Sequence, residues 1–242
     1  MSERLHKLKT LNAAHLKIIA MVCMLLDHTW GILMSGHLWM TCVGRIAFPI
    51  FAFQIAEGYA HTKNFKRYLL RLFLFALVSE IPYNYMCGGG WFYPFGQNVM
   101  FTFCLSLLII RLIDKARVRH WGWGLAAAAV GACMGYWLGM FTFLDYYGYG
   151  VLMVLVFYLF RGVKFGWLIQ LLAMMYINFE MVGGRGFQVG DVFIPTQAFA
   201  VLAMIPILLY NGKQGWKSKR FQYACYAFYP VHIAILIAIA ML

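Results

Sequence analysis

The first long apolar run of the chain contains two residues that could act together on one ligand, Lys17 and His28. Their spacing of eleven residues is close to three turns of an α-helix, so both side chains share a face, about 16.5 Å apart along the axis. An imidazole can act as a general base near neutral pH, and a lysine ammonium group can bind phosphate. The pair therefore suits a long ligand with an anionic head and a reactive group at its other end.

Asp27, Arg45 and His232 are further ionisable residues inside apolar runs. A charge that leaves water needs an opposite charge or hydrogen bonds, so we expect Asp27 to pair with Arg45. The pair can be structural or functional, and the sequence leaves both roles open. His232 could reach the same layer, with Tyr229 and Cys225 on its face of the helix. Taken alone, His232 is more often a core residue than a catalyst.

The composition excludes an ordinary soluble protein. Of the 242 residues, 63% are hydrophobic and 12% are charged, whereas soluble domains are about 25% charged. The mean hydropathy is +0.73, and roughly 20 apolar residues suffice for a helix that crosses a membrane. We therefore predict one all-α integral-membrane domain over residues 1–242. The predicted spans are nine apolar runs: 16–34, 38–60, 68–86, 97–112, 121–141, 148–160, 164–182, 194–210 and 222–241.

The basic residues predict the orientation of these spans. If the N-terminus is cytoplasmic, the alternate loops on that side, with their flanks, hold all 20 Lys and Arg except Arg45 and Arg185. The C-terminus then lies outside. The basic segment Ser2–Thr10 precedes no small-residue cleavage site, so we expect the first span to be retained. A charge of +12 that lines a membrane face favours lipid, and not nucleic acid, as the partner.

A basic stripe follows the second predicted span. Lys63, Arg67 and Arg71 recur at every fourth residue, and Lys66 adjoins them. Anchoring on the cytoplasmic side explains the stripe as well as phosphate binding does. Lys17 taken alone is similarly more often a lysine that extends its ammonium group to the membrane surface.

The remaining polar residues carry weaker signals. Glu57 lies within the second predicted span, and Glu80 lies near the outer end of the third, where a solvated interfacial residue is expected as readily as a functional one. The six cysteines lack C-x-x-C spacing, so the sequence predicts neither a disulfide framework nor a metal site.

Several motifs in order along the chain carry a resemblance to a known family: 16–28, 44–71, 79–83, 97–102, 147–150, 209–213 and 226–232. They resemble the TraX family, which includes the pilin acetylase of conjugative plasmids. A more distant resemblance is to the acyltransferase-3 families, which have a basic residue and then a histidine on the first span, and a basic segment after a later span. The present chain has Lys17 where those families usually have arginine.

The resemblance implies transfer of an acetyl or similar acyl group from cytoplasmic acetyl-CoA. The acceptor would be reached from the membrane or its outer face, as a pilin N-terminal amine or an envelope polymer, and the protein would lie in the bacterial cytoplasmic (inner) membrane. The CoA phosphates would be bound by Lys17, Lys66, Arg67 and Arg71.

Roles at the reacting end follow from the same resemblance together with the chemistry of the side chains. His28 is the expected base, and Arg45 or His232 would stabilise the oxyanion. Asp27 would hold Arg45 or bind the acceptor. Further candidates for acceptor binding are Glu57, Glu80, Tyr229 and His232.

Two other function classes are compatible with the sequence. A transporter or flippase would use Asp27, His28, Arg45 and His232 as a substrate or proton pathway. A scaffold for pilus or envelope assembly would use the buried charges only to select helix partners.

Overall fold

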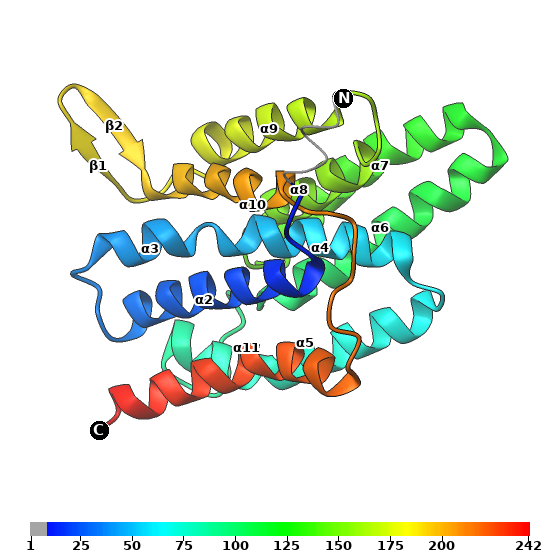
Figure 1. Cartoon of the computed structure of the whole chain (residues 1–242). Helices are drawn as coiled ribbons and strands as arrows, with labels where there is room; N and C mark the ends of the chain where they lie inside the picture. The colour runs from blue at the N-terminus through cyan, green and yellow to red at the C-terminus, as the bar shows by residue number, and fades with distance from the viewer. Residues whose placement is uncertain (1–8) are drawn as a thin grey trace. The chain divides into compact units, whose positions relative to one another are not determined.

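Helices make up most of the computed structural model, which describes residues 9–242 (Figure 1). The predicted basic segment Ser2–Thr10 therefore lies almost wholly outside the described residues. Within them, each of the nine predicted apolar runs contains a helical segment. The helices are α2(Ala13–Ile32), α3(Leu38–Gly44), α4(Ala47–His61), α5(Phe65–Gly88), α6(Val99–Arg119), α7(Trp121–Phe141), α8(Tyr147–Leu159), α9(Gly166–Tyr176), the π-helix η1(Ile177–Met181), the 3-10 helix η2(Thr196–Ala203), α10(Met204–Leu208) and α11(Lys219–Ala240).

Asparagine side chains begin three of these helices. Asn12, Asn64 and Asn98 each precede an apolar run, and each accepts a hydrogen bond from a backbone N–H of the first turn, at 2.9 to 3.1 Å. Those N–H groups have no partner inside the helix, so an asparagine cap lowers the free energy of starting the helix at that residue.

A β-hairpin is the main departure from the all-α expectation, which placed this segment in a loop. β1(Gly186–Val189) pairs antiparallel with β2(Val192–Pro195). Only Gly190 and Asp191 connect the strands, and Gly190 has φ +59°, the left-handed conformation that a tight two-residue turn requires. The sequence pattern for this hairpin is weak, because each strand has only four residues and few of them alternate between apolar and polar.

The second predicted span is interrupted between α3 and α4, at Arg45 and Ile46. Pro49 explains the break, because proline has no N–H to offer the carbonyl of residue 45 and its ring crowds that carbonyl. Two other predicted spans change from one helix type to another. The α-helix α9 continues as the π-helix η1, and the 3-10 helix η2 continues as the α-helix α10. The break at Arg45 proves important for the site.

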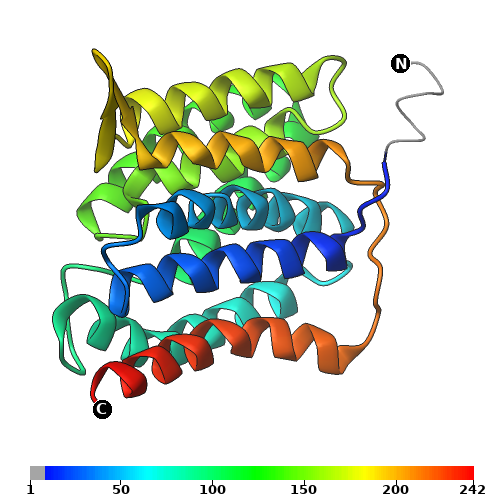
Figure 2. The same cartoon turned by 60° about the vertical axis from the view of Figure 1, so that its left-hand side comes forward.

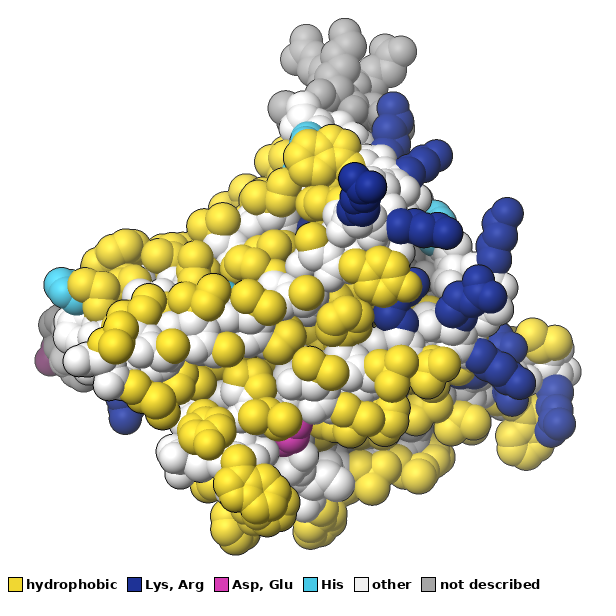
Figure 3. All heavy atoms as spheres, turned by 90° about the horizontal axis from the view of Figure 1, so that it is seen from below, with side chains coloured by type: hydrophobic (Ala, Val, Ile, Leu, Met, Phe, Trp, Pro, Cys, Tyr) yellow, Lys and Arg dark blue, Asp and Glu magenta, His cyan; other side chains and the backbone are white. Residues whose placement is uncertain are grey.

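Within residues 9–242, three helical segments are long and apolar enough to cross a membrane by length and composition: Leu38–His61, Trp121–Phe141 and Lys219–Ala240. α8, with 13 residues, extends about 20 Å and is shorter than a bilayer core of about 30 Å. The count of nine spans and their orientation thus stay predictions. Hydrophobic side chains cover most of the face drawn in Figure 3.

α7 is the least buried of these three candidate spans. Trp121 and Trp123 at its start, and Trp137 and Phe141 at its end, are all more than half exposed. Only 17% of its apolar window is buried in the protein. Aromatic side chains at both ends of an exposed apolar helix are typical of the two membrane–water interfaces.

The described chain divides into two compact units, each treated by itself. The first unit comprises Met1–Gln54 and Val163–Leu242. Its helices lie in a row in which α2 packs between α11 and α3, and η2 packs between α3 and α9 (Figures 1 and 2). α2 therefore has a neighbour on each side, and its polar residues can meet both. That residues 1–242 form a single domain therefore stays a prediction from the sequence.

The second unit comprises Ile55–Gly162. α6 contacts α5, α7 and α8, and supplies much of its buried apolar surface. Gly139 and Gly148 let α7 and α8 approach closely, because a Cβ added at Gly148 would lie 2.2 Å from the carbonyl oxygen of Tyr136.

The basic residues of the second unit all lie at one of its two ends. Asp114 accepts hydrogen bonds from Tyr59 and Tyr158, so the final turns of α4 and α8 meet α6 at one end. Glu80 and Asn98 meet at the other end. The first end carries all nine Lys and Arg of the unit and is the end predicted to be cytoplasmic. These are Lys63, Lys66, Arg67, Arg71, Arg111, Lys115, Arg117, Arg119 and Arg161.

Gly148→Ala should destabilise the protein by about 2 kcal/mol, because the new methyl group would force α8 away from α7. Gly31→Ala is the matched control, since a Cβ there meets nothing within 4 Å and alanine favours a helix. Thermal unfolding in detergent measures both variants. Equal melting temperatures for the two would contradict the close helix contact.

Candidate functional site

The candidate site lies in the first unit, where α2 directs two adjacent residues to two different neighbours. Successive residues of a helix point about 100° apart. Asp27 consequently meets α3, and His28 meets α11. The Asp27 carboxylate is directed to α3, and not to His28, its neighbour in sequence.

Asp27, Thr41 and Arg45 form a polar network. The Thr41 hydroxyl donates to Asp27 Oδ1 at 2.7 Å, and Arg45 Nη2 lies 3.4 Å from the same oxygen. Arg45 also donates from Nε and Nη2 to Thr41 Oγ1, at 3.2 and 3.0 Å. Only 25% of the Arg45 side chain and 18% of the Asp27 side chain are exposed. The expected Asp27–Arg45 contact is therefore present, and Thr41 bridges it.

Two backbone features place this network. Arg45 is the residue at which α3 ends, so the interruption before Pro49 sets its position relative to Thr41, four residues earlier. Gly44 lies against Asp27, and a Cβ at Gly44 would be 2.4 Å from the Asp27 Cβ. Glycine is required here because α2 and α3 approach too closely for any side chain.

His28 and His232 are joined by a hydrogen bond across α2 and α11. His28 Nδ1 lies 2.7 Å from His232 Nε2, and His232 Nδ1 lies 2.6 Å from the Phe228 carbonyl oxygen. The two rings are within 4° of parallel, with centroids 4.9 Å apart. This separation and the short N···N distance mean that the rings meet edge to edge in nearly one plane.

Aromatic side chains hold the plane of the His232 ring. Phe228 stacks on it at 4.6 Å between centroids and an angle of 17°. Tyr229 meets both imidazoles edge-on at 6.0 Å. His232 is only 5% exposed and Tyr229 only 3%. The orientation of His232 is therefore fixed by packing as well as by hydrogen bonds.

Lys17 lies on the same two helices as the histidine pair. It is close enough to Cys225 of α11 for the two groups to interact electrostatically. α2 and α11 run in the same direction (Figure 2). Along them, Lys17 interacts with Cys225, and His28 is hydrogen-bonded to His232. Lys17 and His28 thus both lie on the side of α2 that meets α11, and their joint action on one ligand stays a prediction.

The other predicted phosphate ligands belong to the second unit. Lys66, Arg67 and Arg71 lie on the first two turns of α5, and Lys66 and Arg67 are exposed. Their role stays a prediction from the sequence.

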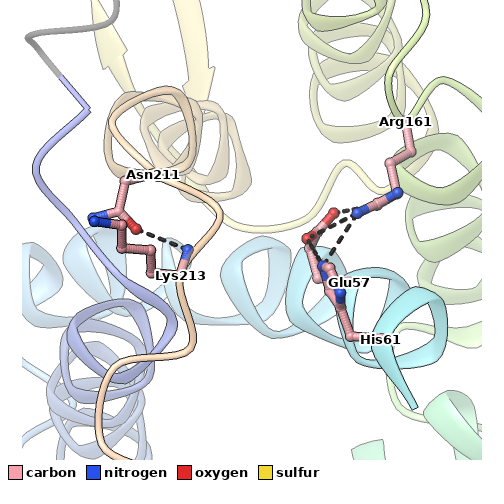
Figure 4. Close-up of polar contacts among 5 residues, drawn as sticks. All are labelled: Glu57, His61, Arg161, Asn211 and Lys213. Atoms are coloured by element: carbon pink, nitrogen blue, oxygen red, sulfur yellow. Dashed lines mark hydrogen bonds and ion pairs between the residues drawn. The ribbon is translucent and has the colours of Figure 1, made fainter. Parts of the chain in front are cut away.

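The two predicted acceptor-binding glutamates are engaged by other side chains. Glu57 accepts a hydrogen bond from Arg161 Nε at 2.5 Å and lies 3.3 Å from His61 Nε2, and Figure 4 shows these three side chains pointing toward one another. Glu80 accepts a hydrogen bond from Asn98 Nδ2 at 2.5 Å. Both contacts are within the second unit.

Sequence reasoning missed several residues that complete these networks. Thr41 carried a signal, since it precedes Arg45 by one helical turn. Phe228, which stacks on His232 and accepts its hydrogen bond through the carbonyl oxygen, was noted only as part of the motif 226–232. The loop motif 209–213 was noted only for its resemblance. In the structure Asn211 Oδ1 accepts from the backbone N–H of Lys213, and this loop bonds to the start of α2 through Lys213 O and Ala13 N (Figure 4).

Comparisons with known proteins agree with the family resemblance. The model of the TraX protein family matches residues 12–240. A probable fimbrial assembly protein, FimC of serogroup H1 from Dichelobacter nodosus, is 29% identical over 95% of this chain and 96% of its own. Protein TraX of Escherichia coli strain K12 is 30% identical over 47% of this chain and 43% of its own. No solved structure matches the chain significantly.

Arg45→Met should cost about 2 kcal/mol of stability, because it leaves the Asp27 carboxylate without its cation. Adding Asp27→Asn to that variant should recover part of the loss, since the unpaired charge is then removed. Thermal unfolding of the two single variants and the double variant gives the coupling energy. Exposed Arg185 is the matched control, and Arg185→Met should change stability by less than about 0.5 kcal/mol. Additive effects at Asp27 and Arg45 would contradict the pair.

Proposed function

The chain belongs to the TraX family, and from this premise we propose that it is a membrane-embedded acetyltransferase. It takes the acetyl group from cytoplasmic acetyl-CoA and transfers it to an acceptor at the membrane or its outer face. The observation that carries the proposal is the position of the His28 imidazole, which is held by His232 and shares its helix face with Lys17. Bacterial relatives and the candidate spans support a place in the bacterial cytoplasmic membrane.

The reaction needs a base at the acceptor. The amine or hydroxyl of the acceptor attacks the thioester carbonyl while His28 takes its proton. The tetrahedral intermediate collapses, the C–S bond breaks, and the proton passes from His28 to the departing CoA thiolate. The products are the acetylated acceptor and free CoA, and His28 is again neutral.

The tetrahedral intermediate carries a negative oxygen that needs a fixed positive group or donor. Arg45 fits this role, because Asp27 and Thr41 hold its guanidinium in place and a quarter of the side chain is exposed. His232 fits it less well, since its two ring nitrogens are engaged by His28 and by the Phe228 carbonyl.

The anionic end of acetyl-CoA needs cations. Lys17 is the proposed contact in the first unit, and the extended pantetheine arm is comparable in length to the rise from Lys17 to His28. Lys66, Arg67 and Arg71 belong to the second unit, and their binding to the phosphates stays a prediction from the sequence.

The acceptor is proposed to be a pilin N-terminal amine, with an envelope polymer as the second possibility. One relative carries the name of a fimbrial assembly protein, which favours the pilin. Tyr229, beside both imidazoles, and Glu80 remain candidates for acceptor binding. Glu57, engaged by Arg161, is better assigned to holding α4 against the end of α8.

A transporter is the second candidate, because the polar residues of α2, α3 and α11 also resemble a proton pathway. Substrate flux across proteoliposomes without any acetylated product would favour it over the acetyltransferase.

Acetyl-CoA should slow alkylation of Cys225 by N-ethylmaleimide, because an arm that runs from Lys17 to His28 passes over this half-buried thiol. Peptide mass spectrometry of the purified protein measures modification at each cysteine. Exposed Cys87 and Cys133 are internal controls and should react equally with and without acetyl-CoA. Lys17→Ala should abolish the protection. An unchanged rate at Cys225 under saturating acetyl-CoA would count against the proposed donor site.

His28→Gln should lower acetyl transfer by on the order of 10²-fold or more, because the base is lost, while calorimetric binding of acetyl-CoA stays nearly unchanged. His15→Gln, at an exposed histidine of the same helix, should leave both unchanged. Arg67→Ala combined with Arg71→Ala should instead weaken binding. Full transfer by the His28 variant would remove the mechanism.

A further inference from the structure

We infer that His232 is a positioning residue that sets the tautomer of His28, so that His28 Nε2 is the nitrogen that accepts the proton. The catalytic meaning of this inference rests on the proposed function, whereas the tautomer itself does not. For an acyltransferase, the sequence suggested acceptor binding or oxyanion stabilisation as the roles of His232. The observation that changes its role is a directed chain of hydrogen bonds across α11 and α2.

The direction of the chain follows from its end at a carbonyl group. A carbonyl oxygen can only accept, so the hydrogen bond from His232 to Phe228 requires a proton on His232 Nδ1. In a neutral imidazole the other nitrogen then has a lone pair, so His232 Nε2 is an acceptor. The contact of 2.7 Å therefore requires that His28 Nδ1 donates. His28 Nε2 is left unprotonated, as a base must be.

The opposite arrangement would need a positive charge on His232. Its Nε2 could donate to His28 only if both of its nitrogens were protonated. His232 is 5% exposed, with Phe228 stacked on one face and Tyr229 at its edge. A cation in such surroundings without a carboxylate beside it is costly. The nearby carboxylate of Asp27 is directed to Thr41 and Arg45.

His232 also matters after His28 has taken the proton. The His28 imidazolium keeps its Nδ1–H directed at His232 Nε2, and a charged donor makes this hydrogen bond stronger. The ring need not turn, because the two imidazoles already lie in one plane. His232 thus performs with a neutral imidazole the orienting role that a carboxylate performs beside other catalytic histidines.

NMR of the imidazole nitrogens in isotope-labelled, detergent-purified full-length protein tests the tautomer directly. The chain has seven histidines, and His28→Gln identifies the His28 signals by their loss. In the wild type we expect a protonated Nδ1 and an unprotonated Nε2 on His28. His232→Phe removes the acceptor, and the His28 signals should shift toward the Nε2-protonated form. His232→Gln can still accept through its amide oxygen and should preserve the wild-type pattern.

Acetyl transfer is the second measurement. His232→Phe should lower kcat by on the order of 10²-fold with little change in the KM for acetyl-CoA, and His232→Gln should restore most of the rate. A His28 that is protonated on Nε2 in the wild type, or that keeps its tautomer in His232→Phe, would overturn the inference.

The two proposals fail in different ways. Absence of acetyl-CoA binding and transfer, together with the expected NMR pattern, would reject the proposed function and leave the tautomer in place. Normal transfer by a well-folded His232→Phe variant would reject the positioning role, and its melting temperature shows whether that variant is folded.

Discussion

The need to pair polar groups inside an apolar protein controls how the first unit is built. α2 carries Asp27 and His28 among apolar residues, and neither side chain can be left without hydrogen bonds at small cost. The row of helices solves this by placing α3 on one side of α2 and α11 on the other. Each neighbour supplies a partner of matching chemistry, and the close approach at Gly44 makes one of these contacts possible.

The same constraint organises the second unit at both ends. Asp114 of α6 receives hydroxyl groups from α4 and α8, and Glu80 of α5 receives the amide of Asn98, which also begins α6. Two of the motifs that carry the family resemblance, 79–83 and 97–102, therefore meet in space. Each of these contacts ties together helices whose apolar surfaces alone would allow sliding.

In the proposed enzyme, these structural solutions also serve the reaction. Arg45 is held in place by its contacts with Asp27 and Thr41. His28 is held in place by its hydrogen bond to His232, in which His232 is the acceptor. A preorganised cation and an oriented base are the groups that acyl transfer requires. The same hydrogen bonds then satisfy the buried polar groups and orient the groups that would react.

Much of the fold follows from local sequence. Apolar runs of sufficient length predicted where helices occur, because hydropathy and asparagine caps act over a few residues. The interruption at Arg45 could have been derived from Pro49, but the run of apolar residues concealed it. The hairpin 186–195 was missed because two short strands and a two-residue turn give a weak pattern beside strongly apolar helices.

The sequence by itself determined where the helices occur and that the basic residues gather in alternate loops. It also predicted the pairing of Asp27 with Arg45, because buried charges of opposite sign have few other ways to be neutralised. Only the tertiary structure decided that Asp27 and His28 turn to different neighbours and that His232, 204 residues along the chain, meets His28. Helical periodicity says which residues share a face, but not which helix packs against it. Which helix packs there depends on the packing of the whole unit. The direction of the hydrogen bond between the two imidazoles depends on that packing as well.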